Sequence, residues 1–315
     1  MKLVLGTMNF GPQINQDVGY EMISAFIAKG YVEIDTAYVY NDGTTENMLG
    51  KILPDFDRTS FSIASKVNPR FTGKLDKNAV INQCHESLER MNLDYIDILY
   101  LHMPDSETPV EVALEACAEL VENNKVKEIG LSNFPSWLVA HSWNVCEKNG
   151  WQLPTVYQGL YNAISRNTEN ELFLCLQHYK MRFYAFNPLA GGLLTGKHLD
   201  FEKMPEDGRF HRLASYRKRY WKPSYIEAVK LITEICVSLN IKPAEAAYRW
   251  LAFHSKLNDI NNDAIIIGAS SIEQFNSNLN SLERGELPIE ILETFDNAWQ
   301  ESKSESPDYF YFYKQ

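Results

Sequence analysis

Short apolar, β-branched runs alternate with longer amphipathic segments along almost the whole chain. Eight of these runs predict strands, over residues 3–5, 32–35, 61–66, 96–102, 126–132, 155–160, 182–187 and 264–268. Each of the first seven precedes a helical pattern or a polar loop leading to one. The helical patterns include residues 77–91, 109–124, 135–149 and 169–180. This alternation predicts parallel strands joined by crossover helices.

Eight strand-helix units favour a closed (β/α)8 TIM barrel over an open doubly wound sheet. The rival Rossmann architecture is disfavoured, because its G-x-G-x-x-G motif does not follow any predicted strand. No stretch rich in Pro, Gly or Ser resembles a linker, so residues 1–315 are expected to form a single domain. The connection over residues 188–223 is long for a barrel, and long loops in compact domains are usually functional.

Two helix starts have local signals. Thr108 before Pro109 predicts an N-cap followed by proline at the first helical position. The segment from Ser271 to Gln274 has the spacing of a capping box.

Charge and cysteine content exclude several classes of protein. The chain has 30 basic and 41 acidic residues, for a formal net charge of −11, which argues against nucleic acids and anionic membranes as partners. No apolar run is long enough for a membrane span, and the first residues lack a signal-peptide pattern. The five scattered cysteines indicate reduced thiols in a cytoplasmic protein. No cluster has metal-ligand spacing, so no metal is expected.

Reactive side chains follow successive predicted strands. Asp35, Lys66 and His102 end the second, third and fourth strands, and Tyr40 lies in the loop after Asp35. In a barrel, the loops at the carboxyl ends of the strands form the active site. These four side chains are therefore expected to converge on one rim.

One mechanism uses all four residues. Reduction of a carbonyl needs a proton donor at the oxygen, and a tyrosine has an unperturbed pKa of about 10. Lys66 could lower the pKa of Tyr40, with Asp35 holding the ammonium group in place. His102 could donate a hydrogen bond that orients the carbonyl. Singly, each residue also has a structural explanation, and Lys66 could instead be a Schiff-base amine of a barrel isomerase or aldolase.

The same residues carry a family resemblance. The segments 35–40, 46–50, 65–66, 101–102, 129–134 and 267–271 resemble the aldo-keto reductase superfamily over nearly the whole chain. Segments 6–8, 183–197, 208–210 and 216–222 look like its aflatoxin-aldehyde reductase branch. The resemblance implies Tyr40 as the acid, supported by Asp35, Lys66 and His102. It also implies a small-molecule carbonyl substrate such as a reactive aldehyde or dicarbonyl, NADPH as cofactor, and a homodimer.

Cofactor positions follow from the same resemblance. Ser132, Asn133 and Gln158 would hydrogen-bond the nicotinamide amide, and Phe186 would stack on its ring. Leu189, Gly191 and Leu193 would line the pyrophosphate, and Ser270, Ser271, Gln274 and Asn278 would meet the adenosine phosphate. The remaining expected cofactor residues are Thr7, Met8, Asn187, Pro188, Lys197, Arg217, Arg219 and Gly268. Ser271 also opens a predicted helix, whose N-terminus would attract phosphate.

The chain departs from the family at two places. Many members have Lys and Arg at the positions of Gly268 and Gln274 to bind the 2′-phosphate of NADPH, so NADH is the alternative cofactor. A basic run in the long loop, Arg217 to Lys222, could supply the missing contacts. Some branch members end in Tyr-Phe-Arg, which can hold a substrate carboxylate, whereas Tyr311 follows Phe310 here.

Two questions stay open at this stage. The aromatic segment 309–313 is expected to pack over the barrel, as a pocket wall, core filler or dimer contact. Some folds of this family act as cofactor-sensing subunits of a partner protein, which is the alternative to an enzyme.

Overall fold

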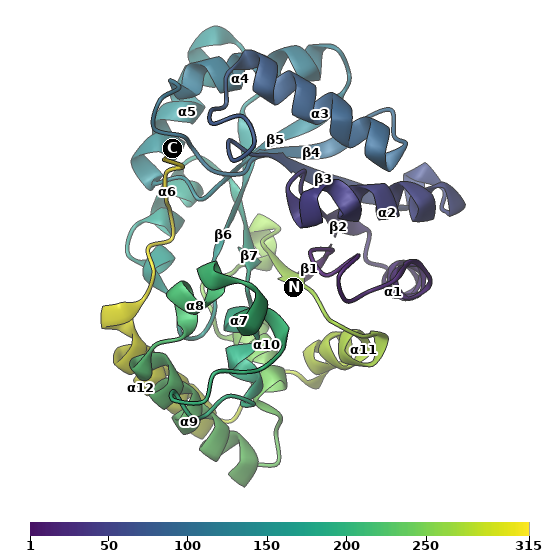
Figure 1. Cartoon of the computed structure of the whole chain (residues 1–315). Helices are drawn as coiled ribbons and strands as arrows, with labels where there is room; N and C mark the ends of the chain where they lie inside the picture. The colour runs from purple at the N-terminus through teal and green to yellow at the C-terminus, as the bar shows by residue number, and fades with distance from the viewer. Residues whose placement is uncertain (315) are drawn as a thin grey trace.

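Eight parallel strands close into a barrel in the order in which they occur along the chain (Figure 1). The computed structural model describes residues 1–314; residue 315, included in the expected domain, lies outside the described part. The strands are β1 (Lys2–Gly6), β2 (Glu33–Asp35), β3 (Ser62–Val67), β4 (Ile96–Leu101), β5 (Val126–Ser132), β6 (Pro154–Leu160), β7 (Arg182–Phe186) and β8 (Ala264–Ile267). The predicted (β/α)8 barrel is therefore confirmed, and no strand bound differs from the predicted one by more than one residue.

Helices surround the barrel in Figure 1. They are α1 (Gln16–Ala28), α2 (Thr44–Ile52), α3 (Lys77–Met91), α4 (Val110–Glu122), α5 (Ser136–Asn149), α6 (Leu172–His178), α7 (Gly208–Arg212), α8 (Ala214–Tyr220), α9 (Pro223–Ser238), α10 (Pro243–Phe253), α11 (Ile272–Ser281) and α12 (Ile289–Ser302). Within residues 1–314, no helix is both long and apolar enough to cross a bilayer.

Helix α3 illustrates why these segments fold as they do. Val80, Cys84, Leu88 and Met91 recur every three or four residues and form its buried face. The side chain of Asp76 accepts a hydrogen bond from the backbone N–H of Ala79 and so caps the first turn. The amphipathic pattern and the cap together fix where the helix begins and which face meets the barrel.

The predicted start of α4 is wrong. Pro109 is the N-cap residue, with an extended ψ of 132°, and the helix begins at Val110 without a side-chain cap. The backbone N–H of Thr108 donates to Asp105 Oδ1 at 2.6 Å. Asp105 organises this loop, which leaves Thr108 outside the helix. The helix predicted over residues 169–180 is shorter than expected, because α6 covers only Leu172–His178.

Packed side chains fill the barrel interior. One buried cluster inside the barrel includes Val4, Ala64, Tyr100 and Tyr184. Gly130 on β5 gives Tyr100 its space, since a Cβ atom there would lie 2.4 Å from the Tyr100 ring. The filled interior leaves the loops at the strand ends as the place for a reaction.

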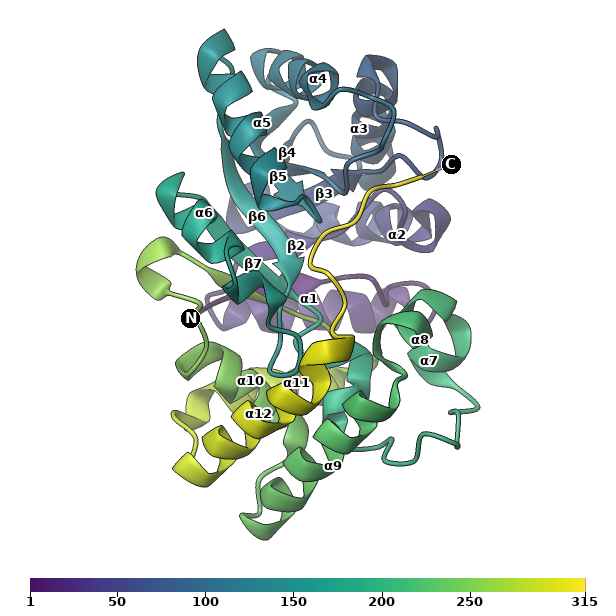
Figure 2. The ribbon, with the colours of Figure 1, turned by 90° about the vertical axis from the view of Figure 1, so that its left-hand side faces the viewer.

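The C-terminal segment crosses the carboxyl end of the barrel, as Figure 2 shows for the yellow chain beyond α12. The backbone N–H of Tyr311 donates to the Asn133 carbonyl at 3.2 Å, and that of Tyr313 donates to the Pro104 carbonyl at 2.8 Å. The side chain of Phe312 stacks on Trp137. The aromatic segment thus packs over the barrel as expected, across the ends of β4 and β5.

Candidate active site

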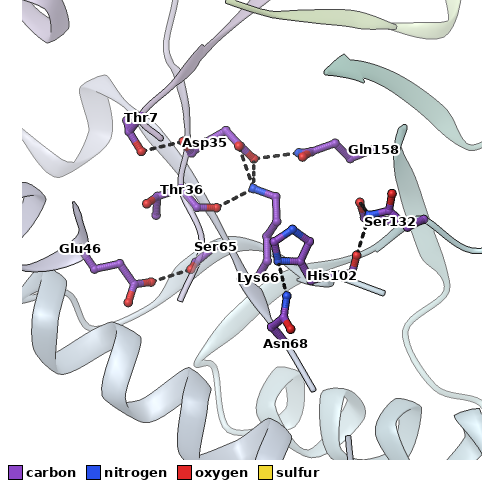
Figure 3. Close-up of polar contacts among 11 residues, drawn as sticks. Thr7, Asp35, Thr36, Glu46, Ser65, Lys66, Asn68, His102, Ser132 and Gln158 are labelled. Carbon is purple, nitrogen blue, oxygen red and sulfur yellow. Dashed lines mark hydrogen bonds and ion pairs between the residues drawn. The ribbon is translucent and has the colours of Figure 1, made fainter. Parts of the chain in front are cut away.

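A buried ion pair lies at the centre of the site (Figure 3). Lys66 Nζ is 2.7 Å from both carboxylate oxygens of Asp35 and 2.6 Å from the Thr36 carbonyl oxygen. Gln158 Nε2 donates to Asp35 Oδ1 at 2.8 Å. Burial lowers the pKa of Lys66, and the Asp35 carboxylate opposes that shift. All three ammonium hydrogens have an acceptor, which holds the charge in one position.

The loop after β2 presents Tyr40. The residues that follow, Asn41 and Asp42, both have a φ of 52°, in the left-handed region that Asn and Asp tolerate better than most residues. Asn41 Nδ2 donates to the carbonyls of Met8 at 3.0 Å and Phe10 at 3.2 Å. These bonds tie the tyrosine loop to the loop after β1.

Tyr40 lies beside two of its expected partners. Lys66 Nζ is 5.2 Å from the centroid of the Tyr40 ring. The His102 ring meets the Tyr40 ring edge-on, with the centroids 6.3 Å apart. Residues from three consecutive strand ends therefore meet at one rim, as the sequence predicts.

The predicted direction of the Tyr40 pKa is wrong, because its pKa is raised and not lowered. Tyr40 lies at the mouth of the barrel, which is the opening formed by the loops at the carboxyl ends of the strands. Burial there raises the pKa of the Tyr40 phenol well above its usual value, and the Asp35 carboxylate raises it further. Asp35 and the Thr36 carbonyl already compensate the Lys66 charge. The phenol therefore keeps its proton at neutral pH.

His102 follows β4 and is held as a neutral ring. Burial lowers its pKa to about 3, with a smaller contribution from the Lys66 charge. Its Nδ1 atom is 3.0 Å from Asn68 Nδ2. Its backbone N–H donates to the Val67 carbonyl at 3.0 Å, and its carbonyl accepts from Asn133 Nδ2 at 2.9 Å. Both the ring and the backbone thus have fixed positions.

The residues expected at the nicotinamide amide connect to Asp35 and His102. Asn133 Nδ2 contacts Ser132 Oγ at 3.0 Å as well as the His102 carbonyl. Gln158 lies inside β6, with its amide directed at Asp35. The three side chains therefore gather on the same wall as the ion pair.

The loop after β7 bends through residues with positive φ. Asn187, Ala190, Gly191 and Gly192 have φ values of 57°, 48°, 72° and 106°. No atom lies within 4 Å of a Cβ built at Gly192, so the backbone there is open to a bound group. Leu193 is fully buried, so it presents no exposed surface to a pyrophosphate.

Four other expected cofactor residues surround this loop. Phe186 is partly exposed at the end of β7, and Pro188 is buried. Thr7 is buried, and its Oγ1 donates to the Asp35 carbonyl at 2.9 Å. The Met8 sulfur accepts from the hydroxyl of Tyr216 at 3.8 Å. Thr7 and Met8 therefore shape the loops around the mouth.

The N-terminus of α11 is built from the expected phosphate-binding residues. Ser271 caps the helix by accepting from the Gln274 N–H at 3.3 Å. Gln274 Oε1 accepts from Ser270, not from Ser271 as a strict capping box requires. Asn278 Nδ2 donates to the Gly268 carbonyl at 3.3 Å. The exposed helix end offers backbone N–H groups to an anion.

The basic run divides into residues with different contacts. Arg217 donates to the carbonyls of Phe210 and His211, both at 2.7 Å, and Lys222 donates to the Glu305 carbonyl. Arg219 lies over the rings of Tyr216 and Tyr220, at 5.8 and 6.0 Å. Among residues 1–314 it has no carboxylate within ion-pair distance. Lys197 is exposed near the start of the long loop.

Sequence reasoning missed four residues at the mouth. Arg209 donates to Asn9 Oδ1 at 3.0 Å, which joins the long loop to the loop after β1. Tyr216 donates to Asn187 Oδ1 at 3.1 Å, and Tyr311 and Tyr216 both contribute to the raised pKa of Tyr40. Only Asn68 has a sequence signal, since it stands two positions after Lys66 at the end of a predicted strand.

A closed barrel with these groups at its carboxyl end agrees with the class that comparison with known proteins gives, the NAD(P)H-dependent oxidoreductases. A model of the aldo/keto reductase family matches residues 2–300, and the chain belongs to this family. The chain is 42% identical to aflatoxin B1 aldehyde reductase member 2 of Mus musculus over 319 residues, which cover 98% of this chain and 87% of the relative. It is 41% identical to aldo-keto reductase family 7 member A3 of Homo sapiens, covering 98% and 96%. An aldo-keto reductase of Pseudocercospora fijiensis is 35% identical, covering 92% and 100%. The expected resemblance to the aflatoxin-aldehyde reductase branch is confirmed.

Proposed function

We propose that the protein reduces aldehydes, reactive dicarbonyls or ketones to alcohols with NADPH, and that Tyr40 is the general acid. The observation that carries the proposal is the convergence of the Tyr40 ring, the His102 ring and the Asp35–Lys66 pair at one rim. The raised pKa of Tyr40 and the lowered pKa of His102 agree with a protonated phenol and a neutral ring. A general acid must hold its proton at the working pH and lie beside a group that orients the substrate. Both conditions agree with the geometry.

The residues fit a dinucleotide cofactor. An anionic pyrophosphate suits the open backbone at Gly192 and the loop that contains Leu189 and Gly191. A phosphate suits the N-terminus of α11 at Ser270 and Ser271. Ser132, Asn133 and Gln158 supply amide and hydroxyl groups beside the acid. Phe186 offers an aromatic face at the end of β7.

The reduced nicotinamide supplies the hydride when it is bound. His102 donates a hydrogen bond to the carbonyl oxygen and polarises it. Tyr40 gives its proton to that oxygen as negative charge develops there. The Lys66 charge then offsets part of the cost that burial and Asp35 impose on the phenolate that remains, and Asp35 keeps the ammonium group in place.

We infer that Arg219 binds an anionic group of the substrate rather than a phosphate of the cofactor. Its neighbours Tyr216 and Tyr311 are the same residues that act electrostatically on Tyr40. Among the described residues, Arg219 has no carboxylate partner. A partly buried guanidinium forms its strongest hydrogen bonds with an anionic group such as a carboxylate. The expected role of Arg217 at the 2′-phosphate is weakened, because its guanidinium already holds two backbone carbonyls.

The Schiff-base alternative is disfavoured by the ion pair. A nucleophilic amine must be uncharged, whereas all three hydrogens of Lys66 Nζ are bound by acceptors. The five unpaired cysteines support the cytoplasm as the compartment. Pairing of two copies stays a prediction, which sedimentation equilibrium tests.

The test of the function begins with the cofactor. NADPH and NADH are titrated against the purified protein, with quenching of tryptophan fluorescence as the readout. Aldehydes, dicarbonyls and ketones are then assayed at saturating cofactor by the loss of absorbance of the reduced nicotinamide. Tighter binding of NADPH and turnover of 4-nitrobenzaldehyde are the expected results. Binding without oxidation of the cofactor across the panel would favour the cofactor-sensing role and overturn the proposal.

A further inference from the structure

Asn68 lies directly beyond the end of β3, two positions after Lys66, and its side chain is almost completely buried. Figure 3 shows it below the His102 ring, on the side away from Asp35. The proposed mechanism does not use this residue. A buried polar side chain in contact with a catalytic ring calls for a physical reason.

The orientation of the Asn68 amide is fixed by a backbone group. The N–H of Arg70 donates to the side-chain atom Oδ1 of Asn68 at 2.9 Å. A backbone N–H can only donate, so the atom that it meets must be the amide oxygen. The amide nitrogen therefore faces His102, with Nδ2 and Nδ1 3.0 Å apart.

A second residue fixes the backbone of Asn68. Gln83 on α3 accepts from the Asn68 N–H at 2.8 Å and donates to the Asn68 carbonyl at 3.0 Å. This pair of bonds holds the loop independently of the Asn68 side chain. The Asn68 side chain is therefore not needed for these two bonds; its Oδ1 accepts from Arg70 and its Nδ2 faces His102.

The donor at Asn68 determines which ring nitrogen of His102 holds the hydrogen. Because Nδ2 donates, Nδ1 must be a bare acceptor, and the hydrogen of a neutral ring must be on Nε2. We propose that Asn68 is a positioning residue for carbonyl reduction, which keeps His102 in the neutral Nε2–H tautomer that donates to the substrate oxygen. The inference rests on the proposed role of His102.

The surroundings of His102 agree with a neutral ring. The charged and titratable groups that face it are Lys66 from β3, with Asp35 of β2 beyond the ammonium group, and Tyr40 from the loop after β2. The nearest full charge is thus a cation, which disfavours an imidazolium. A bare Nε2 would accept instead of donate and would repel the carbonyl oxygen.

The sharpest test is Asn68→Asp, which keeps the size of the side chain but replaces its donor with an acceptor. A carboxylate at this position accepts a hydrogen bond from Nδ1–H and stabilises the imidazolium. The charged ring still donates from Nε2, whereas the neutral ring then has its hydrogen on Nδ1. Turnover of Asn68→Asp should therefore fall as pH rises through the new pKa of His102. At pH 9 the loss should reach about 100-fold, while the wild-type profile stays flat.

Two variants separate this role from simple support of the loop. Gln83→Met removes the backbone clamp, and it should lower stability while the pH profile of turnover stays flat. Asn68→Asp in a His102→Gln background should cause little further loss of turnover, because the ring through which Asn68 acts is absent. An Asn68→Asp enzyme with a flat profile, or an equal further loss in the double variant, would overturn the proposal.

A direct measurement does not depend on turnover. Nitrogen-15 NMR of histidine-labelled protein distinguishes the two tautomers, and His102 is assigned by its loss in His102→Gln. The wild type should show the Nε2–H form at pH 7, and Asn68→Asp should show a protonated Nδ1. An Nδ1–H or cationic ring in the wild type would refute the inference even in an active reductase. A protein without reductase activity but with the Nε2–H form would refute the proposed function instead.

Discussion

Lys66 Nζ lies 2.7 Å from each carboxylate oxygen of Asp35, in a region from which water is excluded. The third ammonium hydrogen meets the Thr36 carbonyl, and Gln158 donates to the same carboxylate. The pair is therefore a fixed charge at the floor of the mouth. Its removal should affect both the fold and the reaction.

Asp35→Asn should destabilise the protein strongly, because it leaves the Lys66 ammonium buried without a counter-charge. We expect the free energy of unfolding to fall by about 3–5 kcal/mol, measured by urea denaturation. The matched control is Glu119→Gln, which breaks an exposed 2.8 Å pair with Lys77 and should cost less than about 1 kcal/mol. Equal losses in the two variants would contradict the importance of the buried pair.

Tyr40→Phe should fold and bind cofactor normally but lose turnover by about 10²–10⁴-fold, because the proton donor is absent. Tyr38→Phe is the control from the same loop, since the Tyr38 hydroxyl donates to Glu86 at the surface. That variant should keep near-wild-type turnover. Near-wild-type activity of Tyr40→Phe would show that another group is the acid.

The pH profile of the wild type should be flat between pH 5 and pH 9 in the direction of reduction. Burial lowers the pKa of His102 to about 3 and raises that of Tyr40 well above its usual value, so neither group titrates in this range. Oxidation of an alcohol needs the phenolate, and its rate should rise with pH throughout. An inflection near pH 6.5 in reduction would mean that His102 changes its charge during turnover.

Arg219→Gln should weaken the binding of anionic substrates more than that of neutral ones. We expect the KM for 4-carboxybenzaldehyde to rise by about 10-fold or more, in line with the loss of a charge-assisted contact, while that for 4-nitrobenzaldehyde changes little. Arg217→Gln is the matched control and should lower thermal stability instead. A selective loss of NADPH affinity in Arg219→Gln would return this residue to the cofactor phosphate.

The strands and the rim residues could be predicted from the sequence because both follow from short-range patterns. An apolar run marks each strand, and Asp35, Lys66 and His102 come at the ends of such runs. The direction of the Tyr40 pKa could not be predicted, since it depends on burial and on how completely Asp35 compensates Lys66. These are properties of the assembled mouth.

Contacts between distant segments could not be predicted from the sequence either. The bond between Arg209 and Asn9 joins residues 200 positions apart. The start of α4 was mispredicted because Asp105, not Thr108, binds the loop N–H groups. The contact from Asn68 to His102 spans 34 positions and depends on a backbone bond from Arg70.

The path of residues 309–313 across the barrel has a consequence for biosynthesis. Strands β4 and β5 leave the ribosome long before the segment that binds at Pro104 and Asn133. The growing chain therefore cannot place this segment over the reactive rim until α12 and the residues after it have been made. A protease cut between α12 and Tyr309 would return the folded enzyme to that immature form.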